Sequence, residues 1–98
     1  MTTIFKKGNK LGKYTLKKDI RIKLTETEAE GQKVFIGENR HLNIIWEVEE
    51  TLEELLETIK ESLIFDFEDI ALEQDNKLSP MAIKLKRTLL RYIGKGEK

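Results

Sequence analysis

The sequence predicts an α+β fold in which an antiparallel meander of three to four strands packs on an amphipathic helix, followed by a second C-terminal helix. Three observations support this fold class. Apolar and charged residues alternate within residues 12–49, apolar residues recur at helical spacing within residues 51–74, and a capped helical pattern spans residues 79–93. A length of 98 residues is typical of one domain, which we assign to residues 1–98.

The first half of the chain is expected to supply the strands. Residues 1–11 are rich in Lys, and we expect them to form a loose basic N-terminus. Alternation is clearest in Asp19–Glu28, and shorter apolar segments follow in Gln32–Gly37 and Leu42–Glu49. These three segments predict a meander, and Tyr14–Leu16 is a candidate for a fourth strand.

The clearest helix begins at Thr51, which is expected to cap it, with Glu54 three residues later as the acid of a capping box. Its apolar stripe continues forward to Ile70, whereas Phe65 and Leu72 fall on the opposite side. Either the helix breaks near Phe65, or its second half carries an apolar face for a partner. We favour a helix that continues to about residue 74 with a kink. The stripe consists of Leu52, Leu55, Leu56, Ile59, Leu63, Phe67 and Ile70.

The last helix is expected to begin after Ser79, which caps it, and to end at Gly94. Its apolar residues cover more than half of its circumference, which is wider than one sheet face requires. This width indicates burial on two sides, as in a homo-oligomer or a complex with a small protein. Lys86 falls inside the apolar arc and either extends its amine to water or pairs with an acidic partner residue. The candidate protein interface is Phe65, Leu72, Ile83, Lys86 and Leu90.

Charges are segregated along the chain although the formal net charge is zero. Residues 1–23 have a net charge of +7, residues 24–78 of −12 and residues 79–98 of +5, from counts of Lys, Arg, Asp and Glu. Two basic ends therefore flank an acidic middle. We favour the interpretation that the ends fold back and neutralise the middle over the alternative that they bind nucleic acid.

A basic stripe on the last helix is the best candidate for nucleic-acid binding. Lys84, Arg87 and Arg91 share one helix face, where cationic side chains meet successive phosphates. The alternative is that cations gather near a helix C-terminus because its dipole favours them. That alternative explains Arg91 better than Lys84.

Composition bounds the protein class. The chain contains no cysteine, which excludes thiol catalysis, thiolate metal sites and disulfides. No apolar run approaches the ~20 residues of a membrane span, so we expect a cytoplasmic protein that does not interact with membranes.

Few residues offer catalytic chemistry. His41 is the one histidine, and it lies in an expected turn without a nucleophile or an orienting acid beside it. The carboxylates around residues 47–57 lack the spacing of a calcium loop, and no glycine-rich phosphate loop is present. We therefore expect no metal, no cofactor, no small-molecule substrate and no enzymatic activity, with a ribonuclease built on Glu, Arg and Tyr left open.

Trp46 has two interpretations. Its position between Ile44 and Val48 on a strand favours a core residue. A platform for stacking bases needs basic neighbours, and the adjacent charged residues are Glu47 and Glu49.

The segment Glu50–Leu63 reads ETLEELLETIKESL, and its Thr-Leu-Glu-Glu opening after a short meander resembles the N-terminal half of HicB-like antitoxins. The resemblance covers about residues 20–65. The family usually carries a Pro-Gly-rich segment before the helix, and Asn39–Trp46 contains neither residue. The resemblance implies a non-enzymatic antitoxin that covers a small ribonuclease toxin with its sheet domain and binds operator DNA through its C-terminal segment.

These observations predict a small protein-interaction regulator of antitoxin type that binds a partner protein or itself. The alternatives are a nucleic-acid-binding module that uses the basic C-terminal helix, and a structural subunit of a larger assembly.

Overall fold

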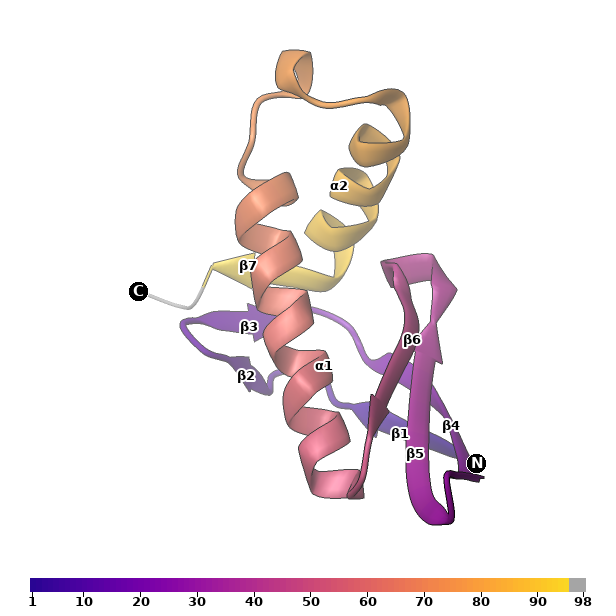
Figure 1. Cartoon of the computed structure of the whole chain (residues 1–98). Coiled ribbons are helices and arrows are strands. Elements are labelled where there is room, and N and C mark those ends of the chain that lie inside the picture. The colour runs from indigo at the N-terminus through magenta and orange to yellow at the C-terminus, as the bar shows by residue number, and fades with distance from the viewer. Residues whose placement is uncertain (96–98) are drawn as a thin grey trace.

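The computed structural model describes residues 1–95 together with their side chains, except the side chain of Trp46, so neither interpretation of that side chain is addressed. Two antiparallel sheets and two α-helices form the molecule (Figure 1), which confirms the predicted α+β class. The larger sheet, sheet A, has the strand order β1 (Thr2–Phe5), β4 (Ile20–Ala29), β5 (Gln32–Asn39), β6 (Ile44–Glu49). The smaller sheet, sheet B, has the order β2 (Lys10–Leu11), β3 (Tyr14–Leu16), β7 (Ile93–Lys95).

The N-terminus is an edge strand of sheet A, so the expectation that residues 1–11 are loose was wrong. Strand β1 pairs with β4 from Thr2 opposite Lys23 to Phe5 opposite Ile20. The Leu24 amide also donates to the Met1 carbonyl at 2.7 Å. Threonine, isoleucine and phenylalanine favour strands, and burial of Phe5 anchors this segment in the core despite the lysines that follow it.

The central helix has the predicted start. Helix α1 (Leu52–Asp66) is capped by Thr51, whose hydroxyl accepts a hydrogen bond from the Glu54 amide at 3.1 Å. The chain does not leave the helix after Asp66 but widens into one π turn, η2 (Phe67–Ala71). Helical structure therefore ends three residues before the predicted residue 74.

The π turn changes which residues the helix buries near its end. The buried residues follow a spacing of four, whereas an α-helix has 3.6 residues per turn and would rotate such positions away from the core. Because the π turn spans more residues, it returns Ala71 to the core and leaves Ile70 half-buried, although Ile70 was the residue expected in the stripe. The buried series is Leu55, Ile59, Leu63, Phe67 and Ala71.

Helix α2 (Pro80–Tyr92) begins at the predicted cap, with the Ser79 hydroxyl accepting from the Ala82 amide at 3.2 Å. A short 3₁₀ turn, η3 (Asp75–Lys77), precedes it. The expected stop at Gly94 was wrong, because Ile93 already adopts an extended conformation and opens β7. Burial of the Ile93 side chain, which is 1% exposed, accounts for the chain turning inward.

The core lies between sheet A and α1 and extends to sheet B and α2. Gly37 of β5 marks the closest approach, since an added Cβ would lie 2.7 Å from the Ile59 side chain. Side chains alternate along a strand, so Ile36 and its partner Val48 lie on the other face of the sheet. Helix α2 packs against η2, β7 and the 3₁₀ turn η1 (Arg40–Leu42). Within residues 1–95, no helix is both long and apolar enough to cross a membrane.

Candidate functional site

Strand β7 brings the two basic ends of the chain together. It pairs with β3 so that Leu16 faces Ile93 and Tyr14 faces Lys95. Lysines of the first basic segment, on β2 and in the turns around β3, therefore adjoin cations of the second segment. This arrangement differs from the favoured expectation that each basic end folds back on the acidic middle.

Lys17 links sheet B to the end of α2. Its backbone amide donates to the Tyr92 carbonyl at 2.7 Å, and its ammonium group donates to the Leu90 carbonyl at 2.6 Å. Its aliphatic carbons cross Gly94, where an added Cβ would lie 2.9 Å from Cδ. The absence of a side chain at Gly94 therefore lets this lysine lie across sheet B and reach the last carbonyls of α2.

Two neighbouring lysines rest on aromatic rings. The Lys18 ammonium lies 5.6 Å from the ring centroid of Tyr92, and that of Lys13 lies 5.8 Å from the ring centroid of Tyr14. The Tyr14 ring itself is buried, and its hydroxyl donates to Glu68 at 2.7 Å, which raises the pKa of Tyr14. The aromatic rings thus support the lysines from below, while the lysine side chains are exposed to water.

The three predicted nucleic-acid residues of α2 are all exposed. Lys84, Arg87 and Arg91 share the helix face directed away from buried Leu89. Arg91 lies in the last turn of α2, and Lys95 follows it in the chain on β7. Its guanidinium is 3.5 Å from the Thr88 hydroxyl.

We name the combined cations the basic surface. Among residues 1–95, none of them has a carboxylate oxygen within 4.0 Å of its nitrogen atoms. The ion pairs that do form lie elsewhere, as between Lys33 and Glu26. The basic surface consists of Lys10, Lys13, Lys17, Lys18, Lys84, Arg87, Arg91 and Lys95.

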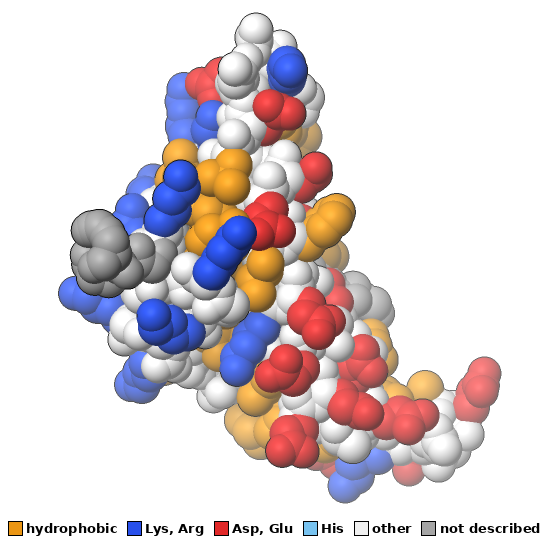
Figure 2. All heavy atoms as spheres, turned by 90° about the vertical axis from the view of Figure 1, so that its left-hand side faces the viewer, with side chains coloured by type: hydrophobic (Ala, Val, Ile, Leu, Met, Phe, Trp, Pro, Cys, Tyr) orange, Lys and Arg blue, Asp and Glu red, His pale blue; other side chains and the backbone are white. Residues whose placement is uncertain are grey.

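Acidic side chains gather beside the basic surface on the same face of the molecule. Figure 2 shows Lys and Arg on one side of this face, Asp and Glu on the other, and hydrophobic side chains between them. Three acids of α1 are exposed and lie opposite its buried stripe; we name Glu53, Glu57 and Glu61 the acidic ridge.

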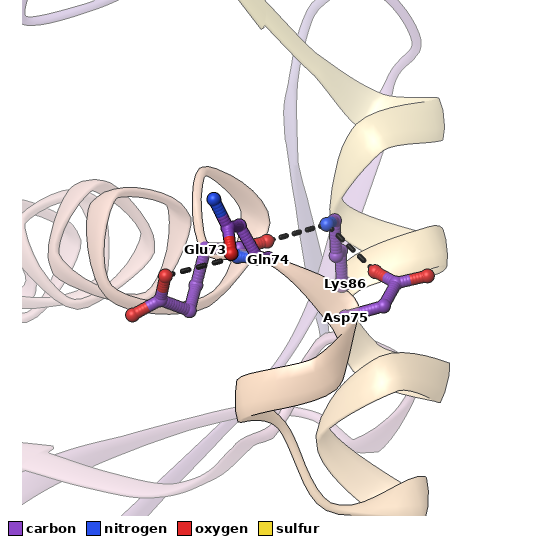
Figure 3. Close-up of polar contacts among 4 residues, drawn as sticks. All are labelled: Glu73, Gln74, Asp75 and Lys86. Carbon is purple, nitrogen blue, oxygen red and sulfur yellow. Dashed lines mark hydrogen bonds and ion pairs between the residues drawn. The ribbon is translucent and has the colours of Figure 1, made fainter.

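Lys86 has its partners within the chain (Figure 3). Its ammonium donates to the Glu73 carbonyl and to the Asp75 carboxylate, the latter at 2.8 Å, and its side chain is 17% exposed. The hydrogen bond and the positive charge of Lys86 lower the pKa of Asp75. The acidic partner of Lys86 is thus supplied by this chain, and the pair connects η3 to α2.

The other candidate interface residues form two groups. Leu72 and Leu90 are 48% and 38% exposed, and Ile83 is half-buried on the α2 face that carries Lys86. Phe65 is 67% exposed and lies apart, on the rim of a shallow pocket between α1 and β6. The structure therefore brings four of the five predicted residues together and separates Phe65 from them.

The pocket beside Phe65 has a volume of about 380 Å³ and an acidic lining that includes Glu47, Glu61 and Asp66. Burial, followed by the charges of Asp69 and Glu47, raises the pKa of Asp66. Within residues 1–95, no group of three or more His, Asp or Glu is arranged to hold a metal ion.

His41 is an exposed residue of η1, in agreement with its expected place in a turn. Its ring meets the Tyr92 ring edge to face, with 6.1 Å between centroids. It also lines a pocket of about 370 Å³ with Arg40 and Lys84. The turn predicted from sequence did not indicate that Lys84 lies beside His41, because the two residues are distant in sequence.

Comparison of the chain with protein-family models, with curated proteins and with solved structures finds no match.

Sequence reasoning missed the lysines of sheet B as site residues. The one available signal was the net charge of +7 over residues 1–23. Their position beside Arg91 and Lys95 depends on the β3–β7 pairing, and nothing in the local pattern indicated that pairing.

Proposed function

We propose that the protein is a non-enzymatic module that binds the phosphate backbone of nucleic acid through the basic surface. The observation that supports this function best is the β3–β7 pairing, which places Lys95 of the C-terminal basic segment beside the lysines that flank β3. Partners that would neutralise the patch are lacking among residues 1–95.

The chemistry of the patch favours phosphates over bases. The cations are exposed, whereas Tyr14 is buried beneath them and Tyr92 is covered by Lys18. Lysine and arginine contacts to phosphates release condensed counterions, so their contribution to affinity depends steeply on salt. Base stacking needs exposed aromatic faces, which this patch does not present within the described residues.

The test is binding of a labelled DNA duplex to the full chain at increasing salt. We expect affinity to fall by roughly 10³-fold between about 50 and 200 mM salt if six or more phosphates are contacted. The variant Lys13→Glu with Lys95→Glu should bind at least about 10-fold more weakly, because each reversed charge removes a contact and adds repulsion.

A matched control carries the same charge change elsewhere. Lys33 and Lys77 are exposed residues of the β4–β5 hairpin and of η3, outside the basic surface. The variant Lys33→Glu with Lys77→Glu should retain duplex affinity within about threefold. Equal losses in the two variants, or absence of binding at 50 mM salt, would reject the function.

A second candidate function is binding of a protein partner, and the exposure of Phe65 favours it. The Phe65 ring is 67% exposed beside an acidic pocket, so a cationic partner could bury the ring and pair with the carboxylates. An antitoxin-like role, implied by resemblance of Glu50–Leu63, stays a prediction. Calorimetry with the product of the neighbouring gene, comparing wild type with Phe65→Ser, tests this role.

A further inference from the structure

The face shown in Figure 2 combines three kinds of surface side by side. Lys and Arg side chains lie on one side of this face and Asp and Glu side chains on the other. Hydrophobic side chains lie between these two groups. Ile64 reaches sheet B, where its Cδ1 would lie 3.2 Å from a Cβ at Gly12. We name four apolar residues the apolar strip, two of them half-buried on α1 and two exposed after η2 and on α2: Leu56, Ile64, Leu72 and Leu90.

Most residues of the two charged surfaces form no ion pair within residues 1–95. Glu53 and Glu61 have no Lys or Arg nitrogen within 4.0 Å among residues 1–95, and Glu57 is paired only with its helix neighbour Lys60 at 3.8 Å. The basic surface is equally without carboxylate partners in the same range. No ion pair within residues 1–95 joins the basic surface to the acidic ridge.

Symmetry determines how such a face meets a copy of itself. A two-fold axis in the plane of the face and parallel to the strip exchanges its two sides, so the basic surface of each copy meets the acidic ridge of the other. An axis across the strip would oppose like charges, which is disfavoured. The first arrangement also places the two apolar strips against each other at the centre, with charges at the rim, as in typical interfaces.

The area that such a contact needs is a small part of the molecular surface. A stable interface buries about 800 Å² on each partner. The accessible surface of the chain is 6694 Å², so the contact would use roughly an eighth of it. Leu72 and Leu90, which are 48% and 38% exposed, would lose their contact with water there.

We propose that a second copy of this chain docks on this face about that axis and that its acidic ridge covers the basic surface in place of nucleic-acid phosphates. Self-association and nucleic-acid binding therefore compete for the same cations. This inference rests on the proposed function for its competition step, whereas the dimer itself is measured without nucleic acid.

The first experiment is sedimentation of the full chain at low and high salt. Wild type should sediment as a dimer at about 50 mM salt and dissociate towards monomer near 500 mM, because exposed charge pairs are screened. Glu53→Lys with Glu61→Lys should be monomeric at both. A wild-type monomer at low salt, or a dimer that strengthens with salt, would overturn the proposal.

Charge exchange makes the test specific to this pair of surfaces. Lys13→Glu with Lys95→Glu should also be monomeric alone, and mixing it with Glu53→Lys, Glu61→Lys should restore a 1:1 dimer. The matched control is Glu26→Lys with Glu28→Lys, on the exposed end of β4. It has the same change in net charge and should dimerise as wild type does. Loss of dimer in the control with retention in the ridge variant places the interface elsewhere and refutes the proposal.

Competition is measured by adding duplex to the preformed dimer. Duplex should convert wild-type dimer into a complex of one chain with nucleic acid. The ridge variant should bind duplex at least about fivefold more tightly than the control of equal net charge, because no second copy competes. Equal affinities of these two variants would overturn the competition. Absence of duplex binding by both would reject the proposed function, while the sedimentation result still decides whether the dimer forms.

Discussion

At the scale of single residues, the half-buried carboxylate of Asp66 affects the stability of the protein. Asp66 lies at the end of α1, in the acidic pocket beside Phe65. Burial is the main reason that its pKa is raised, and the negative charges of Asp69 and Glu47 add to it. Above the folded-state pKa the carboxylate carries its negative charge, which burial and the neighbouring acids disfavour. Ionised Asp66 therefore lowers the stability of the folded chain.

Asp66→Asn should therefore raise the free energy of unfolding at pH 7. The gain should disappear as pH falls below the ordinary aspartate pKa of about 3.9, because the carboxyl group is then protonated in both states. Urea unfolding at several pH values measures this difference. Glu28→Gln is the control, since that residue is exposed on β4. A gain that persists unchanged at pH 3 contradicts the electrostatic explanation.

At the scale of elements, sheet A packs tightly against α1 at Gly37. Gly37 is buried, and a Cβ there would lie 2.7 Å from Ile59 Cδ1 and 3.2 Å from Ile22 Cγ2. Both isoleucines are fully buried in the core. Gly94 of β7 has a similarly short distance of 2.9 Å, but the neighbouring atom belongs to the exposed side chain of Lys17.

Gly37→Ala should reduce the free energy of unfolding by about 1–3 kcal/mol, because the added methyl overpacks a core that cannot shift freely. Gly94→Ala should change it by less than about 0.5 kcal/mol, since the lysine can move aside. Chemical unfolding of the two variants provides the comparison. Similar costs at both positions would show that distance alone, rather than the mobility of the neighbour, sets the penalty.

At the scale of the whole molecule, β7 connects the end of the described chain to its N-terminal part. It carries the C-terminal segment back to β3, which lies near the start of the sequence, and Ile93 inserts next to Leu16 in the core. The same pairing creates the basic surface. Stability and the proposed function are therefore coupled through three residues at the end of the described chain.

Ile93→Ala should lower the free energy of unfolding by about 2–4 kcal/mol, since the residue is 1% exposed and its truncation leaves a cavity. Duplex binding should weaken as well when β7 loosens. Met81→Ala removes an apolar side chain that is 81% exposed on α2 and should cost less than about 0.5 kcal/mol. The prediction fails if urea unfolding gives the two variants equal stability.

Local patterns were sufficient for the elements that have a clear periodicity. The three strands from Ile20 onward, the cap at Thr51 and the cap at Ser79 were all predicted, because alternation and capping residues are local signals. The exposed basic stripe of α2 followed from helical spacing in the same way. The apolar excess at Leu72 and Leu90 was also visible before their positions were known.

The sequence by itself determined the α+β class, the two helices and the separation of basic and acidic segments. Only the tertiary structure decided which segments meet. Strands β1, β2 and β7 are two to four residues long, too short to show alternation, and β7 pairs with a strand almost eighty residues away in the chain. Such pairing is set by burial of Ile93 against Leu16 in a core that exists only once the chain has folded. For that reason the sequence showed two basic ends, and the fold made them one surface.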